Sequence, residues 1–123
     1  MTRPTMEHEL DLLLGSAIDS LAKLEVLLYL RGRPGTVQRP EQIAENLRRD
    51  AKLVAASLES LAQAGLVDRF PLGTGRHVLY GQAEDAHVKE IVDLLYERYT
   101  RDSESRARLV REITAARHGD RPT

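Results

Sequence analysis

Glycine and proline residues interrupt this chain at fixed points and so limit the length and order of its secondary-structure elements. Two glycines and a proline fall within residues 31–35, and this combination ends any helix that precedes it. Pro40 lies where a first helical residue is tolerated. Gly65, Gly73 and Gly75 come later. The segments between these breakers have room only for short helices and strands.

The spacing of apolar residues assigns a structure to each segment. It predicts helices over about residues 6–14, 19–30, 40–48 and 51–64, a short strand at 36–38, and strands at 66–71 and 78–82. Ser16 or Asp19 is expected to cap the second helix, and Asp50 the fourth. The region from residue 84 to about 117 is helical, as one long helix or as two helices joined near residues 102–105.

Composition narrows the class of protein. A chain of 123 residues is one domain in size, and with 4% aromatic residues its core must be aliphatic, which favours helices over a β-sandwich. The absence of cysteine excludes disulfides, thiolate catalysis and cysteine-bound metal. No apolar run approaches the ~20 residues of a membrane span, and the first ten residues do not resemble a signal peptide. We therefore expect a cytoplasmic protein without a membrane partner.

The predicted order of helix, short strand, helix, tight turn, helix and hairpin is typical of a winged helix-turn-helix domain. Three motifs also resemble bacterial winged-helix regulators of the ArsR and MarR groups: EQIAENL at residues 41–47, LESLAQAGLVDR at 58–69 and GRHVLY at 75–80. The resemblance covers roughly residues 17–99. The expected fold class is mainly α with a small β-hairpin: a winged helix-turn-helix with extra terminal helices.

This interpretation divides the chain into four parts. Residues 1–15 form an N-terminal arm with a short helix, and residues 16–83 form the winged helix-turn-helix domain. Residues 84–118 form one or two dimerisation helices, and residues 119–123 form a disordered tail.

The resemblance implies that the third helix of the domain enters the DNA major groove. The side chains expected to meet bases include Ala55 and Ala56, which offer only contact with a thymine methyl, whereas Lys52 and Ser57 carry polar groups. Residues 31–83 carry eight basic and five acidic residues and form the only net-basic part of the chain. The predicted DNA-binding residues are Arg39, Arg48, Arg49, Lys52, Ser57, Arg69 and Arg76.

Apolar stripes at both ends of the chain suggest self-association. The central helices and the hairpin already supply a core, so we expect both stripes to remain uncovered in one copy and to meet in a homodimer. The predicted dimerisation residues are Leu10, Leu13, Leu14, Val88, Ile91, Val92, Leu95 and Tyr99.

The remaining polar residues carry no recognisable chemistry. The four histidines are scattered, and no serine has the local sequence of a nucleophile. We therefore expect no enzyme activity, no metal and no cofactor. The leading hypothesis is a bacterial-type, homodimeric transcriptional regulator that binds double-stranded DNA. The alternative is a winged-helix module that binds another protein and has little or no sequence-specific DNA binding.

Overall fold

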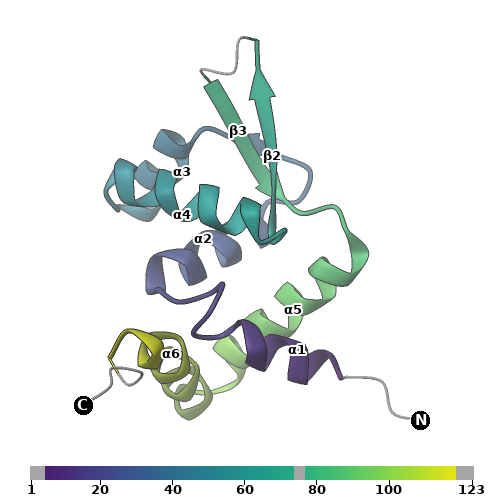
Figure 1. The fold of residues 1–123 in the computed structure, drawn as a ribbon, viewed down its shortest axis with the longest axis vertical. Coiled ribbons are helices and arrows are strands. Elements are labelled where there is room, and N and C mark those ends of the chain that lie inside the picture. Colours follow the sequence, from purple (N-terminus) through teal and green to yellow (C-terminus); the bar gives the residue numbers. More distant parts are fainter. Residues whose placement is uncertain (1–4, 74–76, 119–123) are drawn as a thin grey trace.

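The predicted order of helices and strands is present in the structure, a computed structural model that describes residues 5–73 and 77–118 (Figure 1). Its elements are α1 (Met6–Leu13), α2 (Leu21–Arg31), β1 (Val37–Gln38), α3 (Pro40–Leu47), α4 (Ala51–Gln63), β2 (Val67–Leu72), β3 (His77–Gln82), α5 (Ala86–Arg101) and α6 (Ser103–His118). The expected fold class, mainly α with a small β-hairpin, is confirmed. The expected tail at residues 119–123 lies outside the described residues.

The start of α2 differs from the prediction by its capping residue. Ser20 caps this helix, because its hydroxyl accepts a hydrogen bond from the backbone N–H of Lys23 at 3.2 Å. The predicted caps, Ser16 and Asp19, have other partners. The Ser16 hydroxyl donates to the carbonyl of Leu12, and the Asp19 carboxylate pairs with the Lys23 ammonium at 2.8 Å.

The polar segment between the last two helices is a joint. Asp102 has an extended backbone, with φ of −166° and ψ of 172°, so it ends α5. Its carboxylate accepts a hydrogen bond from the backbone N–H of Ser105 at 2.7 Å, which caps α6 and keeps the pKa of Asp102 below its ordinary value. Of the two structures that the sequence allowed, two helices is the correct one.

The sheet has the order β1-β3-β2, and both pairings are antiparallel. In this register Val37 lies opposite Gly81, where an added Cβ would lie 2.7 Å from the carbonyl oxygen of Thr36. Glycine therefore permits the close approach of β1. The hydroxyl of Tyr29 on α2 donates to the Gln38 side chain at 2.8 Å, which ties this short strand to the helical core.

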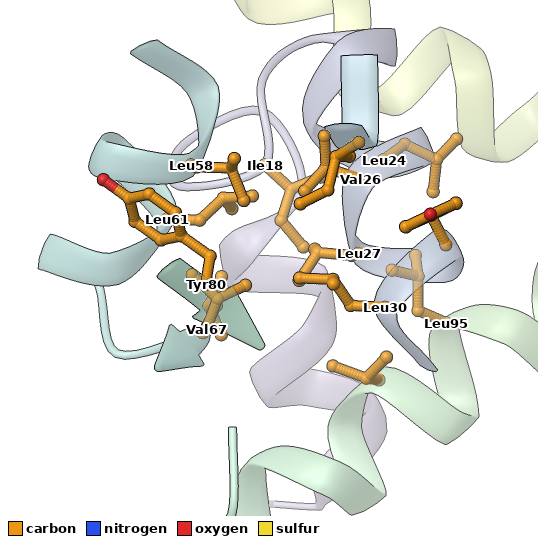
Figure 2. Packing of buried hydrophobic residues seen from close by; sticks show 14 of the residues in the cluster. Ile18, Leu24, Val26, Leu27, Leu30, Leu58, Leu61, Val67, Tyr80 and Leu95 are labelled. Carbon is orange, nitrogen blue, oxygen red and sulfur yellow. The ribbon is translucent and has the colours of Figure 1, made fainter. Parts of the chain in front are cut away.

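One aliphatic core joins the central helices to the hairpin and to α5. Figure 2 shows Leu58 and Leu61 of α4 near Val67 and Tyr80 of the hairpin, with Leu27 and Leu30 of α2 reaching toward Leu95. These side chains are at most 4% exposed. The cluster contains two tyrosines, Tyr29 and Tyr80, and the hydroxyl of Tyr80 lies at its edge (Figure 2).

The expectation that the terminal stripes stay uncovered is wrong. Leu10, Ile91, Val92 and Leu95 are at most 6% exposed in a single copy. The other predicted dimerisation residues are partly buried against the same core: Leu13, Leu14, Val88 and Tyr99. The physical reason is that the terminal helices cover one another, since α1 packs on α5 and α5 packs on both α2 and α6. The apolar stripes complete the core of the monomer.

Polar contacts also fix α1 to α5. The imidazole of His87 lies 2.9 Å from the carboxylate of Glu9. The guanidinium of Arg98 lies 2.8 Å from the carboxylate of Asp11 and donates to the carbonyl of Glu7 at 3.4 Å. The N-terminal helix is therefore attached to the body of the molecule by both apolar and charged contacts.

The turn between α3 and α4 is clamped to α2 by an ion pair. Arg49 donates two hydrogen bonds to the carboxylate of Glu25, at 2.6 Å and 2.9 Å. These bonds hold the pKa of Glu25 below its ordinary value and raise that of Arg49. The bidentate geometry fixes the direction in which the chain leaves α3 and enters α4.

This ion pair predicts an acid-dependent loss of stability. Because its pKa is lowered in the folded state, Glu25 stabilises the fold above its unfolded pKa of about 4.3, and this contribution is lost as pH falls through the folded pKa. Urea unfolding at a series of pH values should therefore show a shallower acid decline for Glu25→Gln than for the parent protein. Identical declines would show that the pair contributes nothing to folding.

Candidate nucleic-acid interface

The outward side of α4 begins at the turn and is largely apolar. The carboxylate of Asp50 caps the helix by accepting from the backbone N–H of Leu53 at 3.0 Å. Val54 and Leu58 are fully buried, which turns Lys52 and Ala56 toward solvent. The first half of this helix thus has one exposed cation in a surface made mostly of small or apolar groups.

Burial corrects one prediction for this helix. Ser57 was expected to reach DNA, but it is only 3% exposed, because it lies one turn from Val54 and Leu61 on the buried side. Leu53 is 44% exposed, because it directly precedes Val54 and helical geometry places it about 100° away from that buried residue.

Arg48 occupies a left-handed conformation between the two helices. Its φ of 57° and ψ of 46° place it at the end of α3, where its backbone N–H bonds to the carbonyls of Ala44 and Glu45. Such a conformation costs a non-glycine residue about 1–2 kcal/mol. The side chain is exposed and forms no ion pair with another residue that the structure describes. The turn therefore presents a free guanidinium beside the start of α4.

Arg39 provides a second exposed cation at the start of α3. It occupies the N-cap position but makes no side-chain capping bond, and Pro40 takes the first helical position as predicted. Its side chain lines a depression of about 440 Å³ with Glu41, Glu45 and His77. This depression places the N-terminus of α3 beside the wing strand β3.

The wing is attached to α4 through one carboxylate. Glu59 accepts a hydrogen bond from the Tyr80 hydroxyl at 2.8 Å and another from Arg69 at 3.1 Å. The Tyr80 hydrogen bond, more than Arg69, lowers the pKa of Glu59, and burial raises that of Tyr80. Glu59 was not singled out from the sequence, since only its position opposite the hairpin reveals this role.

The outer face of the sheet carries exposed apolar side chains. Val37, Phe70 and Leu72 are each 40–43% exposed, and the strand register places them on the same side. An added Cβ on Gly81 would lie 3.7 Å from the Phe70 ring, so this ring covers the glycine. The opposite face carries Tyr80 and contacts α4.

The predicted cations therefore fall into two groups among the described residues. Arg49 and Arg69 are paired with carboxylates of neighbouring elements. Arg39, Arg48 and Lys52 are exposed and have no such partner within residues 5–73 and 77–118. The seventh predicted DNA-binding residue, Arg76, lies outside the described residues. The free positive charge gathers around the turn and the starts of α3 and α4.

The described part of the chain contains neither a group of three or more potential metal ligands nor a helix long and apolar enough to cross a membrane. A depression of about 320 Å³ lies between α1, α5 and α6 and is lined by three arginines and three acidic residues.

Comparison with known proteins finds similarity in structure alone. No protein-family model matches the sequence, and no curated protein is similar to it. The structure resembles a mutant of MepR from a multidrug-resistant S. aureus clinical isolate, with a TM-score of 0.56 and 16% identity over 94% of this chain and 89% of that chain. It also resembles a mutant of MarR from E. coli complexed with operator DNA, with a TM-score of 0.53 and 21% identity over 89% and 78%.

At these identities the similarity concerns the fold. Both alignments span most of this chain and most of the chain to which it is compared. The chain therefore has the winged helix-turn-helix fold of the MarR-like regulators.

Proposed function

We propose that this protein is a winged-helix transcriptional regulator that binds double-stranded DNA. The observation that carries the proposal is the cluster of free, exposed cations around the helix-turn-helix: Arg39, Arg48 and Lys52. Lysine and arginine side chains that contact phosphates supply most of the sequence-independent affinity for a duplex. The structural similarity to a MarR mutant bound to operator DNA supports the same conclusion.

In this proposal α4 lies in the major groove and the cations at its start hold the flanking phosphates. The positive end of the helix dipole and the charge of Lys52 act on the same side. Arg49 and Arg69 act indirectly, because their ion pairs fix the turn and the wing. Ser57 has no part in the interface, since it is buried. Phosphate contacts then determine position on the duplex without reading its sequence.

We also propose that the protein is a cytoplasmic, bacterial homodimer, as a regulator with two recognition helices requires. Half-sites about 34–36 Å apart are read by such dimers. Because the predicted stripes are buried, the proposed contact between copies is made by two other apolar residues: Leu12, which is 64% exposed, and Leu21, which is 38% exposed. The charged depression between α1, α5 and α6 is lined in part by Asp11, which directly precedes Leu12 in the chain.

The alternative function is a module that binds another protein. It is favoured by the exposed apolar face of the sheet, formed by Val37, Phe70 and Leu72, and by the scarcity of polar groups on α4. Such a module would not bind a duplex even at low salt, which separates the two functions experimentally.

The substitution Arg48→Gly tests the proposed DNA contact without destabilising the turn. Glycine adopts the left-handed conformation freely, so the free energy of unfolding should stay constant or rise by up to about 1 kcal/mol. Duplex affinity should fall for all sequences alike, and the slope of log affinity against log salt should become shallower by about one.

A matched control is Arg111→Ala, which removes the same charge from an exposed position on α6, at the other end of the molecule from the wing (Figure 1). This variant should bind duplex almost as the parent does. Equal affinity of the parent and Arg48→Gly would contradict the proposed contact.

Sedimentation at micromolar concentration tests the homodimer. The parent protein should sediment at about twice the monomer mass of 13.8 kDa, and Leu12→Glu should shift it toward monomer while keeping the helical content. Because Ile91 and Leu95 are buried, charges placed there would unfold the chain and would not report on dimerisation. A parent protein that remains monomeric would reject the dimer.

A further inference from the structure

The first half of α4 carries few of the side chains that normally read bases. Among its first six residues Lys52 is the one with a polar side chain, and the others are alanine, leucine or valine. Arginine, asparagine and glutamine read bases through paired hydrogen bonds, and none of them occurs in this stretch. If this helix discriminates between sequences directly, it must do so largely through apolar contact.

Helical geometry gathers the exposed apolar groups into one patch. Leu53 and Ala56 are three residues apart and so are neighbours on the helix surface. Lys52 and Ala56 are four residues apart, which places the cation at the edge of the same patch. Arg48 lies four residues before Lys52, in the connection between α3 and α4. We call Leu53 and Ala56 the α4 patch.

The charges around the α4 patch favour a polyanion over an apolar protein surface. The nearby cations Arg48 and Lys52 are free among the described residues. The carboxylates of α4 and of its N-cap are occupied, since Asp50 caps the helix and Glu59 holds Arg69 and Tyr80. An apolar centre with a cationic rim is complementary to a major groove in which methyl groups lie between two rows of phosphates.

We propose that the α4 patch recognises C5-methyl groups of pyrimidines in the major groove, with Leu53 as the main specificity-determining residue. The ligand class is thymine-rich duplex and, by the same chemistry, duplex that contains 5-methylcytosine. This inference rests on the proposed DNA binding and adds the feature of DNA that is read. Removal of one buried methyl group from such a contact should weaken binding about fourfold.

The experiment compares duplexes that differ only in this methyl group. An alternating A·T duplex is titrated beside the same duplex with deoxyuridine in place of every thymidine, at fixed low salt. An alternating G·C duplex is titrated beside its 5-methylcytosine form. The parent protein should bind the methylated member of each pair about fourfold more tightly, or by more where several methyl groups are contacted.

Variants separate the patch from the phosphate contacts. Leu53→Ala should bring both affinity ratios close to one, while Arg48→Gly should weaken all four duplexes and leave the ratios unchanged. Leu72→Ala is the matched control, because it shortens a leucine that is 43% exposed, against 44% for Leu53, on the sheet face that points away from α4. Ala56→Gln, at an exposed site, provides a second test that should lower the ratios by placing an amide in the patch.

Each outcome has a distinct meaning. Tight binding of all four duplexes with ratios of one in the parent would overturn methyl recognition and leave the proposed function intact. Ratios that survive both Leu53→Ala and Ala56→Gln would overturn the role of the α4 patch. Failure of the parent to bind any of the duplexes would reject the proposed function, and the inference with it.

Discussion

The burial of one side of α4 is the constraint on which the rest of this structure depends. Val54, Leu58 and Leu61 are fully buried, and the helix packs against α2, α3 and β2 through this side. Its orientation then decides which residues face outward, where the turn must run and which carboxylate meets the wing. The ion pair of Arg49 with Glu25 holds the turn before α4 to α2, and the hydrogen bonds of Glu59 hold α4 to the wing.

Because of this packing, the arginines near α4 fall into two groups. Arg49 and Arg69 connect elements through ion pairs, whereas Arg48 and Arg39 have no carboxylate partner among the residues that the structure describes. Arg48 also keeps a left-handed backbone that glycine would adopt at no steric cost. Arginine at such a position is consistent with a role outside folding, since local strain is commonly retained at functional positions.

The sequence predicted the order of elements well because breakers and caps act locally. Pro40 and Gly65 each fix a helix end through backbone geometry, and Asp50 does so with its side-chain carboxylate. The burial of individual side chains depends on distant partners and was predicted less well. Leu95 was expected outside because the covering helices could not be placed, and Ser57 was expected outside although Leu61 shares its side of α4. Ion pairs such as Arg69 with Glu59 likewise require the folded arrangement.

The central claim is that the free cations around the helix-turn-helix bind the phosphates of duplex DNA. The most direct measurement is duplex affinity over a series of salt concentrations. If Arg39, Arg48 and Lys52 each neutralise one phosphate, log affinity should fall linearly with log salt, with a slope of about −3 per protomer. Absence of duplex binding at the lowest salt, or an affinity that does not change with salt, would contradict the account.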